Sequence, residues 1–244
     1  MNLLLLEPDE VDAEGRCALT GRRARHLQDV LGAGVGTSLR AGLLGGGVGE
    51  AVVEEVSPGR AVVRARFGPA PCPSGDALLL AVPRPKVLQR MLAHAAALGF
   101  SRIVLFRSWR VDKSWMQCRA MTASSQREQL VFGLEQAGRT LLPEVLRFDL
   151  FKPMVEDHLP GLELPRRRFV AHPRTERSTH ALADAPGPFC VALGPEGGFT
   201  DYEVEKLAGA GFDPVTMGPH ALRTETALAA LWGQLDLLRR RAQR

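Results

Sequence analysis

Two segments near the end of the chain share an arrangement that constrains the fold more than any other feature of the sequence. Each is an apolar run, then a stretch with glycine and proline, then the start of a helix. The first contains LGPEGGFT at Leu193–Thr200, and the second contains MGPHALRTETALAAL at Met217–Leu231. This order of elements is typical of α/β proteins, in which helices alternate with buried parallel strands.

The first segment predicts a strand, a loop and a helix. Residues 188–193 form a short apolar run of the kind found in buried parallel strands. Thr200 and Glu203 have the spacing of a capping box, so a helix should begin there. Glycines in the intervening GPEGG stretch allow positive φ and close approach to a ligand. Open α/β sheets bind ligands at the carboxyl ends of their strands, where this loop is expected to lie.

The second segment predicts the same arrangement. Residues 214–217 form a short strand, and Gly218 and Pro219 then turn the chain. Thr224 is expected to cap a helix that runs through Trp232. We expect the two loops to form one pocket; the alternative is that both are ordinary turns before capped helices.

The loops lack the features of a phosphate site. GPEGG has neither the GxxxxGK[ST] lysine nor the GxGxxG spacing, and it carries Glu196 where a phosphate cradle would avoid an acid. Backbone amides and carbonyls beside a carboxylate suit a ligand with hydrogen-bonding edges and a positive centre. S-adenosylmethionine fits that description, although the residue types alone do not name it.

The chain is expected to contain two domains. Residues 1–67 hold short alternating segments and glycine-rich turns, which are typical of a small β-barrel. GPAPCPSG at 68–75 reads as a linker. The remainder alternates strands with helices, which predicts a mostly parallel sheet covered by helices. The expected strands are 76–84, 102–108 and 168–173, and the expected helices are 85–98 and 123–137.

Composition excludes several classes of protein. No apolar run approaches the roughly 20 residues of a membrane span, and acids follow the first leucines, so we expect neither a membrane segment nor a secretory signal. A cytoplasmic location is therefore predicted. The four cysteines form no CxxC pair, which argues against zinc and against a disulfide framework. No metal is expected.

Basic clusters are candidate nucleic-acid contacts. The formal net charge is +4, and only four of the 31 basic residues are lysine. Arginine suits bidentate phosphate contacts and stacking on bases. Arg22, Arg23, Arg25 and His26 form a basic patch on what reads as a short helix, with the arginines at i and i+3 on one side. This patch either grips phosphates or is simply solvated. Trp109 and Trp115, interleaved with Arg110 and Lys113, either stack on an unpaired base or pack in a core or dimer interface.

Both glycine segments resemble the cofactor-binding motifs of the SPOUT class of RNA methyltransferases. Within that class they are similar to the bacterial 16S ribosomal RNA uridine-N3 methyltransferase family (RsmE-like), whose LGPEGGF and LRTETA motifs stand intact at 193–199 and 222–227. Looser matches lie at 25–31 and at 135–139, which resemble the family's HHLxxVLR and EQxGR elements.

The resemblance implies an N-terminal PUA-like RNA-binding β-barrel over residues 1–70. It also implies a SPOUT α/β domain over residues 76–244 that contains a trefoil knot. The implied reaction is methylation of uridine N3 in 16S ribosomal RNA, with S-adenosylmethionine as cofactor. The implied partners are 16S rRNA or the small ribosomal subunit and a second copy of the chain, because family members pair through the last helix.

The resemblance and the chemistry of the reaction together give candidate site residues. Arg223 is expected to stabilise the negative charge that develops on the uridine carbonyl oxygens, and Glu225 to act as base or orienting group. The expected cofactor-binding residues are His172, Leu193, Gly194, Pro195, Glu196, Gly197, Gly198, Met217, Gly218, Leu222, Arg223, Thr224, Thr226 and Ala227. The expected RNA-binding residues are Arg22, Arg23, Arg25, His26, Arg110 and Arg139.

Some positions depart from the family pattern. His94 and Ala97 stand where a KATELGV stretch is usual, Gly32 replaces an arginine, and residues 107–115 replace a TERS-like strand end. These positions lie outside the two glycine loops. Two alternatives therefore stay open: a related methyltransferase acting on another RNA or base, and a catalytically silent RNA-binding protein.

Overall fold

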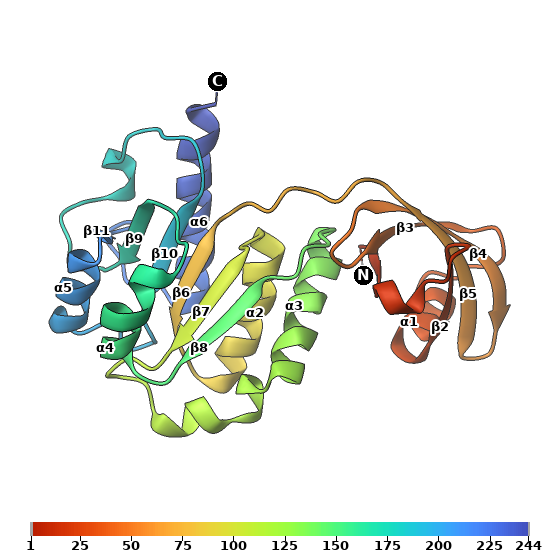
Figure 1. Cartoon of the computed structure of the whole chain (residues 1–244), viewed down its shortest axis with the longest axis horizontal. Helices are drawn as coiled ribbons and strands as arrows, with labels where there is room; N and C mark the ends of the chain where they lie inside the picture. The colour runs from red at the N-terminus through yellow and green to blue at the C-terminus, as the bar shows by residue number, and fades with distance from the viewer. Residues whose placement is uncertain (1, 244) are drawn as a thin grey trace. The chain divides into compact units, whose positions relative to one another are not determined.

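A computed structural model describes residues 2–243, which form two compact units (Figure 1). The first unit comprises the residues up to Pro73 together with Val131–Leu142. The second comprises Ser74–Leu130 together with the residues from Pro143 onward. Each unit contains its own sheet, so the protein has a mixed α/β fold with one curled and one parallel sheet.

The first unit is built on a five-stranded sheet in the order β1-β3-β4-β5-β2. All neighbouring strands in it are antiparallel except β1 and β3, which are parallel. Its strands are β1 Leu4–Leu6, β2 Arg16–Thr20, β3 Ser38–Leu43, β4 Val48–Ser57 and β5 Arg60–Phe67. Helix α1, Gly21–Arg25, runs into a wider helical turn at His26–Val30. A further helical turn lies at Pro8–Glu10.

Apolar side chains that alternate along these strands form the core of the first unit. Leu19 and Val63 are fully buried there, as is Leu6. Gly49 on β4 allows a close approach of two strands, because a Cβ atom at this position would lie 1.9 Å from the Arg66 carbonyl oxygen. This glycine is therefore required by packing rather than by a turn.

A segment distant in sequence completes the first unit. Thr140 donates its hydroxyl to the Gly46 carbonyl at 2.6 Å and accepts the Gly45 amide at 2.8 Å. Glu135, 2% exposed, pairs with Arg22 at 2.9 Å. These contacts attach residues 131–142 to the turn between β3 and β4 and to α1.

The second unit has a six-stranded sheet in the order β11-β9-β10-β6-β7-β8, with every neighbouring pair parallel. Its strands are β6 Ala77–Ala81, β7 Arg102–Phe106, β8 Glu144–Phe148, β9 Arg167–Ala171, β10 Phe189–Leu193 and β11 Asp213–Val215. β6 and β10 are buried along their whole length, as expected for central parallel strands.

Helices connect these strands. They are α2 Pro85–Leu98, α3 Ala123–Ala137, α4 Phe151–Pro153, α5 Asp201–Gly209 and α6 Thr224–Arg241. Short helical turns lie at Lys113–Gln117, Arg119–Met121, Met154–His158, Leu159–Gly161 and Thr179–Ala181. Figure 1 shows α6 running along the sheet, where it contacts β10 and α2.

The sequence patterns predicted most of these elements, but they did not predict β8, and α6 extends to Arg241, beyond the expected Trp232. α2 and α3 have the predicted bounds, and α5 is preceded by Thr200 in a complete capping box with Glu203. The predicted cap at Thr224 is wrong. Arg223 is the N-cap residue of α6, and Thr224 is the first helical residue with its side chain 6% exposed. An N-cap residue has non-helical backbone angles, and here Arg223 is extended while Thr224 already belongs to the first helical turn.

A buried ion pair anchors the end of α6 to the sheet. Arg239 bonds both oxygens of Asp76 at 2.9 and 3.0 Å, and the Phe189 amide donates to Asp76 at 3.0 Å. Asp76 is 1% exposed and lies just before β6, while Phe189 begins β10. Burial raises the pKa of the Asp76 carboxyl, and the Phe189 amide and the Arg239 guanidinium oppose that rise. One carboxylate thus ties two central strands to the last helix.

Within residues 2–243, no helix is both long and apolar enough to cross a membrane.

Replacing Arg239 with alanine should lower the free energy of unfolding by about 3 kcal/mol or more, because it leaves the Asp76 charge buried without its partner. Urea denaturation measures this change. Arg240→Ala is the matched control, since Arg240 pairs with Asp236 while its own side chain is 70% exposed, and it should cost less than about 1 kcal/mol. Equal losses in both variants would contradict the anchoring role of Arg239.

Candidate active site

The candidate site lies at the carboxyl ends of three adjacent parallel strands. β10 leads into the GPEGG loop, its neighbour β9 ends just before His172, and β11 leads into the second glycine loop. Because the strands are parallel, all three ends meet at one edge of the sheet. This explains how segments far apart in sequence converge.

The first loop is held by its own backbone and by α2. The Gly198 amide donates to the Pro195 carbonyl at 2.8 Å, with Gly198 at φ +70°. Gly194 permits a tight fold, since a Cβ atom there would lie 3.0 Å from the Phe199 nitrogen. Glu196 accepts the backbone amide of Arg84 at 3.1 Å. Glu196 therefore fixes the loop to the start of α2.

Glu203 is the buried anchor of the first loop. One of its carboxylate oxygens accepts the amide and hydroxyl of Thr200 at 2.9 and 3.0 Å. The other oxygen accepts the backbone amide of Trp109 at 2.8 Å. Glu203 is 2% exposed, so these three hydrogen bonds compensate the burial of its charge. Arg110, next to Trp109, donates to the Gly197 carbonyl.

The second loop is held by the segment that follows β9. Thr216 donates its amide to the Arg177 carbonyl at 2.9 Å, and its own carbonyl accepts the Thr179 amide at 3.0 Å. The Thr216 hydroxyl bonds the Gly218 carbonyl at 2.9 Å, and Gly218 has φ +148°, a value that favours glycine.

The two loops enclose a cavity of about 720 Å³, inside the range of about 300–1,000 Å³ typical of small-molecule sites. Most of the predicted cofactor-binding residues line it. They are His172, Leu193, Gly194, Pro195, Glu196, Gly197, Gly198, Met217, Leu222, Arg223, Thr224 and Ala227, with the predicted catalytic Glu225. Two are not among its lining residues: Gly218, which borders a neighbouring cavity, and Thr226, which is exposed on α6.

Sequence reasoning missed part of the lining. Arg84, Val87 and Arg90 reach the cavity from the start of α2, and Ala171 and Thr216 from the ends of β9 and β11. The sequence contained the information needed to include the residues of α2. The loop between the predicted strand at 76–84 and the predicted helix at 85–98 must lie at the same edge of the parallel sheet as the two glycine loops.

Two exposed arginines line the cavity, Arg84 and Arg223, and no hydrogen bond or ion pair of the Arg84 side chain occurs within residues 2–243. Arg223 is exposed, and its side chain has no hydrogen bond or ion pair with any residue in 2–243. Glu225 bonds Arg90 at 2.9 Å. The pKa of Glu225 is lowered first by its own backbone amide and then by Arg90. Burial and the nearby Arg174 lower the pKa of His172, which favours the neutral imidazole.

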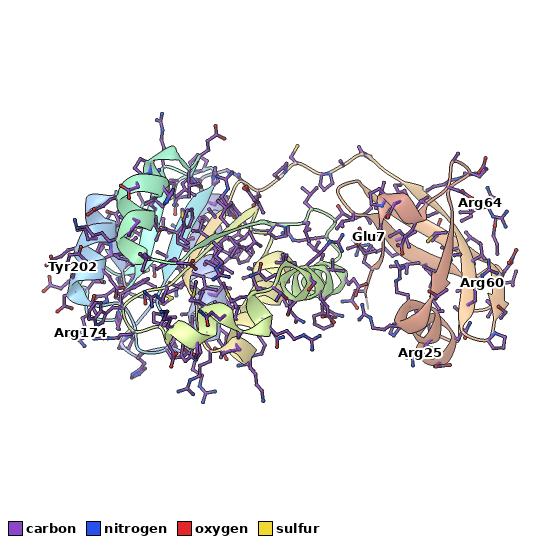
Figure 2. All side chains as sticks on the ribbon, turned by 60° about the horizontal axis from the view of Figure 1, so that its bottom comes forward. Glu7, Arg25, Arg60, Arg64, Arg174 and Tyr202 are labelled. Carbon is purple, nitrogen blue, oxygen red and sulfur yellow. The ribbon has the colours of Figure 1, made fainter. Side chains whose placement is uncertain are left out.

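The predicted RNA-binding residues differ in their pairing. Arg23 bonds Glu10, and Arg22 pairs with Glu135. Arg25 is exposed on α1 (Figure 2), and within residues 2–243 its side chain bonds only the Gly21 carbonyl of its own helix, at 3.4 Å. His26 has its Nε2 atom buried without a partner among the described residues, and Arg139 is exposed. Arg25 and Arg139 are thus the most available of the group in the first unit.

No cluster of three or more histidine, cysteine or acidic side chains with metal-binding geometry occurs among residues 2–243.

The comparison with protein families decides the class of the chain. Residues 71–236 match the model of the RNA methyltransferase domain, which covers more than half of the sequence. The chain belongs to this family. The matched region includes both glycine loops and every residue that lines the cavity.

Curated relatives agree over nearly the whole length. The chain is 28% identical over 236 residues to ribosomal RNA small subunit methyltransferase E of Treponema pallidum, covering 94% of this chain and 88% of the relative. It is 29% identical over 238 residues to the protein of that name from Mycobacterium bovis, covering 92% and 84%. The resemblance drawn from the two glycine motifs is thereby confirmed.

Solved structures show the same fold. Ribosomal RNA small subunit methyltransferase E of Neisseria gonorrhoeae, solved with S-adenosyl methionine, superposes with a TM-score of 0.74 at 21% identity, covering 98% of both chains. A methyltransferase from Legionella pneumophila, solved with bound cofactor, gives 0.74 at 24% identity, covering 98% of this chain and 97% of that one.

The pKa of Glu225 should lie below the ordinary glutamate range, and Arg90→Ala should raise it only partly, because the backbone amide at the start of α6 remains. Carbon-13 NMR titration of the side-chain carboxyl measures both. A lowered folded-state pKa stabilises the fold above the unfolded value, and this contribution is lost as pH falls through the folded pKa. Arg147→Ala, a distant surface variant, should leave the Glu225 titration unchanged. An unchanged pKa in Arg90→Ala would contradict the pairing.

Proposed function

We propose that the cavity between the two glycine loops binds S-adenosylmethionine. Family membership and the size of the cavity support this. The donor set also fits: the loops offer backbone amides and carbonyls beside Glu196, which suits a ligand with an adenine edge and a cationic sulfur. When bound, S-adenosylmethionine supplies an electrophilic methyl group.

We further propose that the methyl acceptor is N3 of a specific uridine in 16S ribosomal RNA. The names of the curated relatives support the RNA, and the RsmE-like LRTETA motif supports the base. N3 lies on the Watson–Crick edge, so the uridine must be unpaired or turned out of its helix before it reacts.

Arg223 carries the proposed chemistry. Uridine N3 must lose its proton to become nucleophilic, and negative charge then develops on the flanking carbonyl oxygens. A guanidinium at the cavity wall, with no partner of its own, is available to stabilise that charge. Glu225 takes the orienting role rather than that of a base. Its hydrogen bonds to Arg90 and to its own backbone amide lower its pKa and so stabilise the ionised carboxylate.

The finer description of the fold is also part of the proposal. The first sheet, over residues 1–70, is assigned as a PUA-like barrel, and residues 76–244 as a SPOUT domain with a trefoil knot. The hydrogen bonds of Thr216 to residues 177 and 179, followed by the return of α6 to β10, support passage of residues 217–223 through the loop at 172–188.

Homodimer formation and a cytoplasmic location remain predictions. Four leucines on one side of α6 are all buried within the single chain: Leu228, Leu231, Leu235 and Leu238. A dimer would therefore use other side chains of this region, such as Leu237, which is 56% exposed. In RNA binding, we assign the leading role in the first unit to Arg25 and Arg139, because Arg22 and Arg23 already have carboxylate partners.

Reverse transcription of 16S rRNA from a strain lacking the gene tests the function. Methylation at N3 blocks pairing and stops the polymerase, so one stop should disappear with the gene and return with the wild-type copy. A stop that persists would exclude this uridine-N3 activity. Loss of a methyl mark elsewhere would favour another base as the target.

Gly197→Arg should abolish binding of S-adenosylmethionine without unfolding the protein. Gly197 lines the cavity and is exposed, and the nearest atom to an added Cβ is Cδ of the flexible Arg110 side chain at 3.2 Å. Isothermal titration calorimetry measures the affinity. Gly209→Arg is the control, because Gly209 lies on α5 with open space around it. Unchanged affinity in Gly197→Arg would contradict the cofactor assignment.

Arg223→Ala should slow methyl transfer by about 10²- to 10³-fold, the size typical of losing one charge-stabilising donor. RNA affinity should change little, because the role of Arg223 is exerted in the transition state. Single-turnover assays with radiolabelled cofactor measure the rate, and Arg147→Ala serves as the control for loss of one surface arginine. A rate within about threefold of the parent would remove Arg223 from the chemistry.

A further inference from the structure

A second cavity lies beside the first, on the opposite flank of one short segment. Gly197, Gly198 and Phe199 line the cavity between the glycine loops, while Thr200 and Glu203 line the second. Its volume is about 860 Å³. The remaining lining residues come from the end of β7 and from the region around α4 and α5. They are Arg107, Ser108, Trp109, Val111, Leu150, Phe151, Lys152, Pro153 and Tyr202.

Three exposed apolar side chains gather at this cavity. Trp109 is 84% exposed, Leu150 is 51% exposed and Tyr202 is 49% exposed. Figure 2 shows Tyr202 projecting from α5 at the surface of the second unit. Large aromatic surfaces left in water on the rim of one cavity mark a binding surface rather than a core. Flat aromatic rings are suited to stacking on a planar ligand.

The polar groups of the cavity suit a nucleotide. Arg107 and Lys152 place two cations on its lining, and Lys206 stands 5.8 Å from the ring centroid of Tyr202. Ser108 is 3% exposed, and its hydroxyl has no hydrogen-bond partner among residues 2–243. Ser108 lines the cavity, so its hydroxyl is a group there that still needs a hydrogen-bond partner, and the edge of a base can supply one. Aromatic rings with flanking cations are the pattern by which proteins hold single-stranded RNA.

Hydrogen bonds connect the residues that line the second cavity to the loop that lines the first. Glu203, which lines it, accepts hydrogen bonds from Thr200 and from the backbone amide of Trp109. Arg110 donates to the Gly197 carbonyl in the cofactor loop. A ligand that binds Trp109 therefore contacts the residue next to Arg110, which itself bonds the loop proposed to hold the methyl donor.

We propose that this second cavity holds an unpaired base of the substrate RNA, next in the strand to the nucleotide that reacts in the first. Trp109 and Tyr202 stack on the base, Ser108 bonds its edge, and Arg107 and Lys152 contact the adjoining phosphates. The proposal rests on the proposed function in that it requires an RNA substrate, but it requires neither uridine nor N3 as the methylated position.

Trp109→Ala tests the proposal in the full-length protein. Stacking on one aromatic ring corresponds to about a 5- to 150-fold change in affinity, so binding of a short single-stranded oligouridylate should weaken by that factor. Trp109→Phe should retain most of the affinity, and Phe132→Ala, the loss of an exposed aromatic ring outside the cavity, should have no effect. Binding of S-adenosylmethionine should be unchanged, because the Trp109 bond to Glu203 uses the backbone amide.

Two further measurements separate the possible outcomes. Oligouridylate should quench tryptophan fluorescence in the parent and not in Trp109→Phe, whereas uridine monophosphate alone should quench only weakly if the cavity requires a strand. Lys152→Ala should reduce the slope of log affinity against log salt by about 0.7, the value for one lost phosphate contact on a single strand.

The results distinguish this proposal from the proposed function. Weaker RNA binding in Trp109→Ala would support the second cavity, and if the parent protein does not methylate uridine N3, the proposed activity alone is overturned. Parental affinity and parental KM in Trp109→Ala, with methylation intact, would overturn the second cavity alone. Unchanged RNA affinity with a change of mass in light scattering would assign this surface to contact between protein chains and would also overturn the proposal.

Discussion

One buried carboxylate organises the region on which the candidate site depends. Glu203 accepts three hydrogen bonds, two from Thr200 and one from the Trp109 backbone. It thereby fixes the end of the GPEGG loop, the start of α5 and the chain beyond β7 at one point. A buried charge without hydrogen-bond partners is costly. If one of these elements moved independently of the others, the Glu203 carboxylate would lose hydrogen bonds or become exposed.

This arrangement divides the carboxyl edge of the parallel sheet into two cavities. The segment around Phe199 and Thr200 separates them, with glycine backbone and Arg223 on one flank and exposed aromatic rings on the other. The division matches a methyltransferase that must hold a small cofactor and a polymer strand at adjacent places. At the other end of the sheet, the Asp76–Arg239 pair anchors α6, whose N-cap residue is Arg223.

Local patterns were sufficient where a signal involves neighbouring residues only. The capping box at Thr200, the bounds of α2 and α3 and the central strand β10 follow from spacing and apolar runs. The same reasoning misplaced the cap of α6 by one residue, because the backbone is extended at Arg223 and already helical at Thr224. Local patterns also could not show that Arg23 forms an ion pair with Glu10 and Arg22 with Glu135. The fold brings these partners together.

The sequence by itself determined the class of protein and the two glycine loops, because motif spacing and the alternation of apolar segments are properties of short stretches of chain. Tertiary structure decided which side chains share a cavity. Arg90 meets Glu225 across 135 positions, and Trp109 meets Glu203 across 94. Such contacts depend on strand order in the sheet, and strand order is fixed by the packing of the whole unit rather than by any local run of residues.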